Sequence, residues 1–495
     1  MSGSTDFPAL RAFRLLALTV LLFVFSIGVP AQPSAERLAA IQGAVEAQVR
    51  AGQSVVKEFG VHIVDVESGE PVYNYQANRP RILASNTKLF TTAAALDVLG
   101  PGFFFETPLL AAGKVEEGTL KGPLAVLGSG DPNLSGRQFF GDSFAVFRKW
   151  AWALRGQGVQ RVTGDLYLVN GLFEGAWVHP DWPRDQLTRW YEAPVDSLSF
   201  NDNCVLVKVY PGLRVGERGR IEVLPRVPLF EVTGNLRTIG SARQQWVTID
   251  RELGTNTLKV DGRIYLRSEP VEKWVAVEDP VQYFGAALRQ AMVEEGVVLE
   301  GKVFRADALP KEAWRPVDVH RSDLLTTLEV INKRSQNFYA ESILKGLGAR
   351  HCDRGDWTGG LRAVLEFAER IGVELEDLNL VDGSGMSRNN RATARHLTSL
   401  LRAMYFHRWG QEFLRTLPYS GEIDLSWEKR LADPPYRGNV FAKTGTLNGV
   451  STLSGYAKAK SGRLYAFSIL CNQTHSTWEA KRVQDRIVRA LIDQG

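Results

Sequence analysis

The chain has 495 residues, of which 44% are hydrophobic and 23% are charged, and its formal net charge is +4. This balance excludes collagen-like and disordered proteins, and the length is typical of about two to four domains with large cores. No long run of Lys or Arg accompanies the small net charge, so nucleic acid is not an expected partner.

The N-terminus predicts a signal peptide over residues 1–31. Arg11 and Arg14 precede an apolar run over 15–29, and the small residues that follow place the cleavage site after Ala31. A retained membrane anchor is the alternative, but the run is short for a spanning helix and no second apolar stretch approaches that length. We expect an exported protein of the periplasm or cell envelope, without a stable membrane span once the signal is removed.

The cysteines and histidines give no metal signature. Cys204, Cys352 and Cys471 allow at most one disulfide bond, and the spacing leaves the pairing open. Cys204 and Cys471 lie in apolar runs typical of buried strands. The histidines form no His-Glu-x-x-His motif and the cysteines no Cys-x-x-Cys motif, so neither a metal nor another cofactor is expected.

The first part of the mature chain has the pattern helix, hairpin, helix. Apolar residues at helical spacing predict an amphipathic helix over 34–51, and two alternating segments separated by a turn predict a β-hairpin over 60–78. A second helix is expected from Ser85 to the stop signal Gly100-Pro101.

Residues 104–315 have a different character. Short strands are expected at 123–130, 164–169 and 204–212, a run of β segments over 220–268 and a helix over 280–296. We interpret this region as one or two inserted domains, of which the second is mostly β.

After the insertion the chain returns to helices and ends in a β-meander. Helical patterns cover 322–348, 359–372 and 392–405, strand patterns cover 439–473, and an amphipathic helix is expected over 476–494. The hairpin signals Asn448-Gly449 and Ser461-Gly462 divide the strand region into three. The front hairpin and this meander can form one five-stranded antiparallel sheet with helices on both faces, which predicts an α/β domain split by an insertion.

Ser85 and Lys88 lie three residues apart at the start of a predicted helix, so they share a face and can reach each other. A serine hydroxyl is a good nucleophile only when a base takes its proton, and a lysine is such a base only when its amine is neutral. Burial and a second nearby cation would each lower the pKa of that amine. The same spacing recurs at 54–57 and 342–345, so alone it indicates an ordinary helix start more often than a catalytic pair.

Ser335 and Asn337 stand at an expected junction between helices. Ser335 is a candidate proton relay between Lys88 and a leaving group, and Asn337 is a candidate partner of a substrate amide. A helix-capping turn is the alternative interpretation, since Ser and Asn are common at such turns.

Lys443-Thr444-Gly445 occurs once, on a predicted strand just before a tight turn. Lys443 and Thr444 can bind a carboxylate by charge and by hydroxyl, and Gly445 leaves room for a ligand that pairs along the strand. An ordinary strand with an exposed lysine is the alternative.

In this order, Ser-x-x-Lys, Ser-x-Asn and Lys-Thr-Gly form the signature of the penicillin-recognising serine acyl-transferases. The gap of 250 residues between Ser85 and Ser335 restricts the candidate families within this superfamily. The chain resembles the D-alanyl-D-alanine carboxypeptidase/endopeptidase family, the class C low-molecular-mass penicillin-binding proteins. The resemblance covers the mature chain, most weakly at 212–270, and rests further on the stretches 128–134, 192–203, 277–297 and 380–390.

The resemblance implies a penicillin-recognising serine transpeptidase-like domain, with a nested α+β insertion that contains a small all-β domain. The corresponding division is a signal peptide over 1–31, a catalytic domain over 32–103 and 316–495, an inserted domain over 104–315 and a small β domain over about 212–270. No cofactor is implied.

The resemblance also implies roles for the candidate residues. Ser85 would be the acylated nucleophile and Lys88 its base. The remaining pocket residues would be Ser335, Asn337, Lys443, Thr444 and Gly445. The backbone N–H groups of Ser85 and Thr446 would bind the oxyanion, and a loop with Asp382 and Ser384 would lie near the site without an assigned chemical step.

The implied reaction is acyl transfer on peptidoglycan peptides, by attack between two D-alanines or at a cross-link and hydrolysis of the acyl-enzyme. The balance between these two activities stays open. β-Lactam antibiotics would acylate the same serine, because they present a similar amide and carboxylate. A β-lactamase of the same superfamily and an inactive peptidoglycan-binding scaffold protein are the rivals.

One departure from the family pattern concerns the third residue of the peptide stem. Relatives are expected to carry an acidic residue near 164–173 that binds the free amine of that stem residue. Val169 or Asn170 occupies this position here, and Asp165 is expected on the face of the strand that points away from the site. Recognition of a diaminopimelate-type amine is therefore not supported by the sequence.

Overall fold

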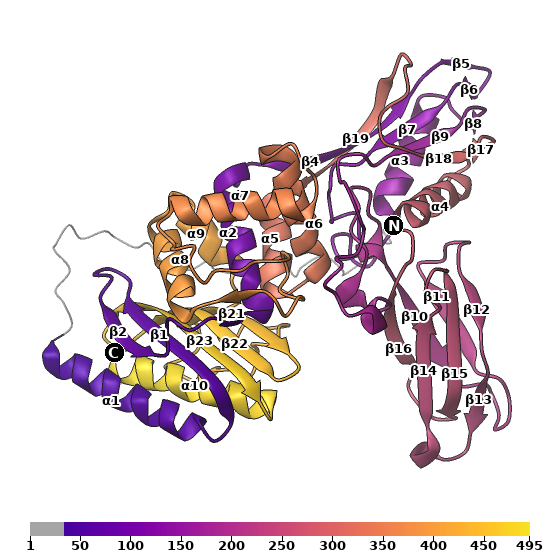
Figure 1. Cartoon of the computed structure of the whole chain (residues 1–495). Coiled ribbons are helices and arrows are strands. Elements are labelled where there is room, and N and C mark those ends of the chain that lie inside the picture. Colours follow the sequence, from indigo (N-terminus) through magenta and orange to yellow (C-terminus); the bar gives the residue numbers. More distant parts are fainter. Residues whose placement is uncertain (1–33) are drawn as a thin grey trace, which may run out of the picture.

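The computed structural model describes residues 34–495, so the signal peptide predicted over 1–31 lies outside the described residues. Figure 1 shows an elongated molecule in which the first and last parts of the described chain share one body. The middle of the chain forms a second body, which ends in a β-rich arm. Segments far apart in the sequence therefore build the first body together.

A five-stranded antiparallel sheet is the centre of the first body, with the strand order β2-β1-β23-β22-β21. Its strands are β1 (Val56–Asp65), β2 (Pro71–Tyr75), β21 (Val440–Leu447), β22 (Val450–Lys458) and β23 (Leu464–Thr474). The front hairpin joins the rear meander through β1 and β23, whose register places Val61 opposite Ile469. The α/β fold class predicted from the two patterns is confirmed.

Helices cover both faces of this sheet. On one face, α1 (Ala35–Gly52) and α10 (Thr477–Gln494) pack side by side (Figure 1) and bury the apolar stripes that predicted them. The other face carries η1 (Ala84–Asn86), α2 (Thr87–Leu99), α5 (Leu324–Lys333), α6 (Asn337–His351), α7 (Trp357–Arg370), α8 (Ala394–Phe406) and α9 (Gly410–Thr416). A separate hydrophobic cluster fills each face.

The chain leaves the first body through β4 (Phe104–Ala111) and returns through β19 (Arg315–Asp323). These two strands pair antiparallel, with Phe104 opposite Asp323, so entry and exit of the insertion lie together. They belong to a mixed sheet of order β18-β9-β7-β4-β19, whose other strands are β7 (Leu124–Leu127), β9 (Leu166–Val169) and β18 (Val303–Ala306). A smaller sheet beside it contains β5 (Lys114–Glu116), β6 (Thr119–Lys121), β8 (Arg161–Val162) and β17 (Val298–Leu299).

Two helices pack against these sheets, and one of them was not predicted from the sequence. α4 (Pro280–Glu294) matches the expected helix, whereas α3 (Ala145–Gly156) was overlooked. The buried residues of α3 include Phe147, Trp150 and Leu154, whose spacing is that of an amphipathic helix. Phe147 joins the two helices, because its ring lies 4.8 Å from that of Phe284 in an edge-to-face contact.

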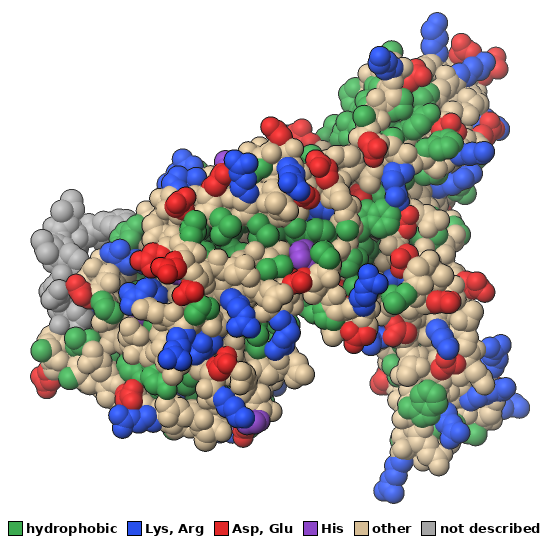
Figure 2. Space-filling model, viewed as in Figure 1, with side chains coloured by type: hydrophobic (Ala, Val, Ile, Leu, Met, Phe, Trp, Pro, Cys, Tyr) green, Lys and Arg blue, Asp and Glu red, His purple; other side chains and the backbone are tan. Residues whose placement is uncertain are grey.

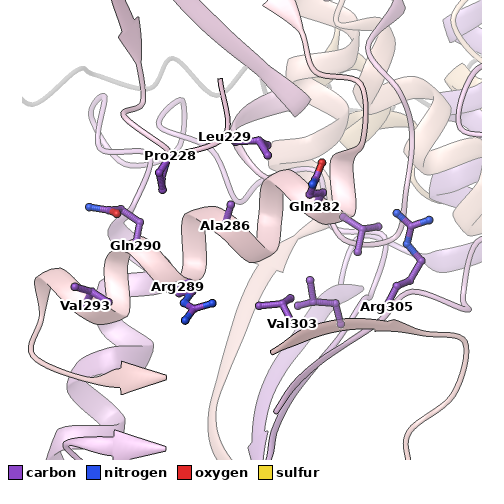
Figure 3. A pocket seen from close by; sticks show the side chains of 11 residues that line it. Pro228, Leu229, Gln282, Ala286, Arg289, Gln290, Val293, Val303 and Arg305 are labelled. Carbon is purple, nitrogen blue, oxygen red and sulfur yellow. The ribbon is translucent and has the colours of Figure 1, made fainter. Parts of the chain in front are cut away.

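The β-rich arm, which we call the nested β unit, runs from β10 (Cys204–Tyr210) to β16 (Val271–Ala276). One of its sheets has the order β11-β10-β16, and the other contains β12 (Glu231–Thr233), β13 (Leu236–Ile239), β14 (Trp246–Arg251) and β15 (Thr257–Tyr265). β11 is Arg220–Leu224. The unit thus extends on both sides beyond the range 212–270. A cavity of about 690 Å³ separates α4 and β18 from the segment Pro228–Leu229 (Figure 3).

Residues 34–495 include no helix that combines the length and the apolar character needed to cross a bilayer. Within the same range, no cluster of His, Cys, Asp and Glu side chains is arranged to hold a metal ion. All three cysteines are free thiols, and Cys204 and Cys471 are buried as expected.

Trp150→Ala tests the packing of the unpredicted helix. Because Trp150 is fully buried in the inserted region, its truncation is expected to lower the unfolding free energy of that region by about 3–5 kcal/mol, measured by chemical denaturation. Trp152→Ala is the matched control, because Trp152 lies on the same helix and is 55% exposed. Its expected effect is within about 0.5 kcal/mol, and equal losses for the two variants would contradict the described packing.

Candidate active site

Ser85 lies in the single turn of η1 rather than in the first turn of the α-helix, which starts at Thr87. The residue before it, Ala84, has a φ of +46°, a conformation that L residues with a side chain rarely adopt. A Cβ added at Gly385 would collide with the carbonyl group of Ala84, so the serine turn and a distant loop approach each other closely. Such strain is typical of positions that the surrounding fold holds in place for function.

Lys88 is the most constrained polar residue near Ser85. Its side chain is fully buried, and its Nζ donates to Ser85 Oγ at 3.1 Å, to Asn337 Oδ1 at 2.7 Å and to the backbone carbonyl of Ser384 at 2.7 Å. All three acceptors are formally neutral. The protonated amine therefore has an acceptor for each of its three protons without a directly bound carboxylate, and the neutral amine can keep two of these bonds while its lone pair faces Ser85 Oγ.

The environment of Lys88 favours the neutral amine. Burial lowers the pKa of Lys88 to about 7, and the negative charges of Glu341 and Asp382 limit that decrease. A lysine with this pKa is a competent base near neutral pH. The prediction that Ser85 and Lys88 reach each other is in agreement with the 3.1 Å hydrogen bond.

Ser335 and Lys443 form the second pair of the site. Ser335 lies between α5 and α6 with a φ of +57°, and its Oγ accepts a hydrogen bond from Lys443 Nζ at 2.9 Å. Lys443 also donates to the carbonyl of Thr444 at 2.9 Å. Burial first, and the charge of Lys88 second, lower the pKa of Lys443 well below its ordinary value. The serine expected to relay protons is thus bonded to Lys443 rather than to Lys88.

Asn337 connects the first body to the inserted region. Its Oδ1 accepts from Lys88, while its Nδ2 donates to the backbone carbonyl of Tyr191 at 2.9 Å. The sequence suggested that this amide would hold a substrate backbone. Both ends of the Asn337 amide are bonded within the protein, where they help to orient Lys88, and the contact with a substrate backbone stays a prediction.

The Lys-Thr-Gly strand, β21, is the edge strand of the five-stranded sheet and runs beside η1. Gly445 is required here, because an added Cβ would collide with Thr452 and lie 2.9 Å from the backbone nitrogen of Ser85. The sequence explained this glycine by room for a ligand along the strand, but the close approach of η1 is the observed reason. Thr444 is half-buried and Thr446 is exposed, so both remain accessible.

The loop with Asp382 and Ser384 is held by a residue that the sequence did not single out. Glu341 on α6 is fully buried and accepts from the backbone N–H groups of Gly383 and Ser384 at 3.0 and 2.7 Å. Burial, together with the charge of Asp382, raises the pKa of Glu341 to about 7. Glu341 thereby fixes the loop whose Ser384 carbonyl binds Lys88.

Asp382 organises the same loop from the other side. Its carboxylate accepts from the backbone N–H groups of Gly385 and Ser387 at 2.7 and 2.6 Å, and from Trp182 Nε1 at 3.0 Å. Trp182 belongs to the inserted region, so this contact is a second connection between the two bodies. Neither Glu341 nor Trp182 lies in a sequence motif that would mark it as part of the site.

The position where relatives are expected to carry an acidic residue is occupied by Asn170, whose amide is bonded to a nearby carboxylate. Asn170 follows β9 and donates from Nδ2 to Asp196 Oδ2 at 2.8 Å, and Trp177 Nε1 donates to the same oxygen at 2.8 Å. Asp196 is 1% exposed, and burial raises its pKa. The carboxylate beside Asn170 is therefore already bound within the protein, and Val169 adds no charge there.

The chain is similar to known proteins in both sequence and fold. The profile of the D-Ala-D-Ala carboxypeptidase 3 (S13) family matches residues 41–494. A D-alanyl-D-alanine carboxypeptidase of Actinomadura sp. (strain R39) is 32% identical over 88% of this chain and 81% of its own length. Penicillin-binding protein 4 (dacB) of Haemophilus influenzae has a crystal structure that is 26% identical, with a TM-score of 0.78 over 89% of this chain and 97% of its own. A second structure of that protein, in complex with a β-lactam, is 25% identical, with a TM-score of 0.74 over 90% of this chain and 97% of its own.

Glu341→Gln tests the electrostatics around Lys88. The Glu341 carboxylate raises the pKa of Lys88, so its neutral replacement is expected to lower that pKa further below 7. Titration of the Lys88 signal in protein with 13C-labelled lysine, assigned with Lys88→Arg, measures this shift.

Glu366→Gln is the control for that titration, because Glu366 is an exposed acid on α7 that pairs with Arg362. It is expected to leave the pKa of Lys88 unchanged. A Lys88 pKa that rises or stays constant in Glu341→Gln would contradict the described charge arrangement.

Proposed function

The chain belongs to the D-Ala-D-Ala carboxypeptidase 3 (S13) family of serine hydrolases, and on this premise we propose that it is an exported DD-peptidase that forms an acyl-enzyme on Ser85. Its substrates are the D-Ala-D-Ala termini and the cross-links of peptidoglycan peptides, and β-lactams acylate the same serine. The predicted signal peptide supports export. The β-lactam complex of the Haemophilus influenzae relative supports acylation by these antibiotics.

The hydrogen bond between Lys88 and Ser85 carries this proposal. A neutral Lys88 takes the proton of Ser85 as Oγ bonds to the carbonyl carbon between the two D-alanines. The electron pair of the carbonyl π bond moves to its oxygen, and the backbone N–H groups of Ser85 and Thr446 bind the resulting oxyanion. A single oxyanion donor of this kind contributes roughly 3–4 kcal/mol to catalysis.

The oxyanion collapses as the carbon–nitrogen bond to the terminal D-alanine breaks. The leaving amine takes the proton that Lys88 received. We keep Ser335 as the relay for this proton, with its hydroxyl held in place by the hydrogen bond from Lys443. A water molecule then adds its oxygen to the acyl carbon while Lys88 takes one of the water protons. The ester bond between the acyl carbon and Ser85 Oγ then breaks, Oγ takes the proton that Lys88 received from the water, and release of the acid completes the cycle.

The substrate carboxylate is bound by Lys443 and Thr444. The pKa of Lys443 is low in the ligand-free site because burial leaves its ammonium form unbalanced. A carboxylate beside it favours the protonated form, so binding of the free C-terminus restores the positive charge. This coupling supports a preference for substrates that end in a free carboxylate.

We also propose the domain division given by the sequence, with one adjustment. The catalytic domain comprises 32–103 and 316–495, and the inserted domain comprises 104–315. The small β domain is better taken as 204–276, because β10 and β16 pair within it.

Ser85→Ala is expected to abolish both D-alanine release and labelling by a fluorescent penicillin, because the nucleophile is lost. Ser54→Ala is a matched control, since Ser54 has the same Ser-x-x-Lys spacing but is exposed. It is expected to keep full activity. Chromatography of a pentapeptide digest measures release, and persistent release in Ser85→Ala would disprove the assignment of the nucleophile.

Lys443→Ala is expected to reduce kcat/KM about 10- to 100-fold on a peptide with a free C-terminal carboxylate, because a hydrogen bond to a charged group is lost. The same peptide with an amidated C-terminus is expected to lose much less. Steady-state kinetics on the two peptides measure the difference, and equal losses would contradict the carboxylate role.

A further inference from the structure

A groove runs along the nested β unit and comes close to the active site. Two hollows of about 250 and 810 Å³ meet where both are lined by Arg137, Asp202 and Trp274. The smaller one reaches Arg334 and Gln336, the two neighbours of Ser335. Figure 2 shows open space between the first body and the nested β unit. The cavity of Figure 3, by contrast, is lined by α4 and β18 and does not reach Ser335.

The floor of the larger hollow is the outward face of the sheet β11-β10-β16. Along β10, Val205, Val207 and Val209 are buried, whereas Leu206 and Lys208 are half-buried and line the hollow. Trp274 pairs directly with Leu206 across the strands and lies on the same face. A regular strand alternation thus presents one continuous surface to the groove.

Two tryptophans are displayed at the end of the groove nearest the active site. Trp190 is 42% exposed and Trp274 is 44% exposed, and both line the smaller hollow. An isolated antiparallel bridge joins Arg189 to Val275 of β16, and the two tryptophans are the chain neighbours of these bridged residues. Large rings left exposed in a groove are typical of binding sites, and indole faces stack well on the C–H faces of sugar rings.

Polar groups beside these rings are held in a strained turn. Asn201, Asp202 and Asn203 all have positive φ, between 51° and 56°. This turn directs Asp202 to Arg137 at 2.6 Å and to the Nε2 of Gln336 at 3.1 Å. Within residues 34–495, Asp202 Oδ1 and Gln336 Oε1 have no hydrogen-bond partner. Two buried acceptors without a partner therefore belong to residues that line the smaller hollow, at a position where the fold tolerates backbone strain.

The charges along the groove are largely balanced within the protein. Arg137 pairs with Asp202, Lys208 with Glu272 and Arg226 with Glu222. Little net charge remains to attract a charged peptide. Exposed aromatic faces, unpaired acceptors and balanced charge together suit a neutral ligand that is rich in hydroxyl and amide donors.

We propose that this groove binds the glycan strand of peptidoglycan, with an amino-sugar ring stacked on Trp274. The inference rests on the proposed function, because the peptide cleaved at Ser85 is attached to that strand. It adds a second recognition element, so the substrate is a stem peptide on its polymer rather than a free peptide. The combined hollows extend well past the space that a dipeptide needs.

The test compares one pentapeptide in two forms, free and attached to a short glycan chain. For the wild type, kcat/KM is expected to be higher on the glycan-linked form. In Trp274→Ala the ratio of the two values is expected to fall about tenfold, and Trp274→Phe is expected to recover part of it. Trp246→Ala is the matched control, since Trp246 lies on β14 of the same unit, is 52% exposed and lines neither hollow.

A direct measurement uses the β-1,4-linked tetramer of N-acetylglucosamine, which has no peptide. Its binding, measured by calorimetry, is expected in the wild type and in Trp246→Ala and is expected to be lost in Trp274→Ala. Absence of tetramer binding together with an unchanged kcat/KM ratio would overturn the proposal, as would groove binding by a free stem peptide instead. Failure to cleave either pentapeptide would count against the proposed function, while the tetramer would still test the groove.

Discussion

The site depends on one amine that is buried without a directly bound acid. Transfer of an ammonium group from water into a protein interior is costly, and a carboxylate in contact with it would restore an ordinary pKa. Lys88 is surrounded instead by a hydroxyl, an amide oxygen and a backbone carbonyl. Glu341 and Asp382 lie close enough to influence Lys88, but their oxygens bind the N–H groups of the neighbouring loop. In its neutral form the amine can keep its two donor bonds to Asn337 and Ser384, and its lone pair faces the hydroxyl of Ser85, whose proton it can accept.

The inserted region is part of this arrangement rather than an appendage. Tyr191 bonds the amide that orients Lys88, and Trp182 bonds the carboxylate that shapes the adjacent loop. Both contacts cross from one body to the other. A substitution in the inserted region can therefore change the orientation or the pKa of Lys88 without a direct contact. The residue next to Tyr191 in the chain is Trp190, which is exposed in the groove. In the proposed function, a few residues connect peptide recognition, glycan recognition and the base strength of Lys88.

Much of the fold follows from local patterns. The alternation of apolar and polar residues in the front hairpin and the rear meander, together with their turn glycines, predicted the five-stranded sheet. The order of the motifs Ser-x-x-Lys, Ser-x-Asn and Lys-Thr-Gly predicted which distant segments come together at the site. The missed features depend on contacts between distant segments. Glu341 is an ordinary acid in a helical sequence until the loop at Gly383 packs on it, and the need for glycine at position 445 is decided by η1. Helix α3 was overlooked although its pattern was present.

The pH dependence of the acylation rate of Ser85 by a penicillin tests the central claim most directly, because the proposed mechanism requires the neutral form of Lys88. The rate should rise with a single ionisation near pH 7 and then level off, since burial lowers the pKa of Lys88 to about 7. A rate that is constant from pH 5 to pH 9, or that rises only near the ordinary pKa of lysine, would contradict the role of a buried neutral amine.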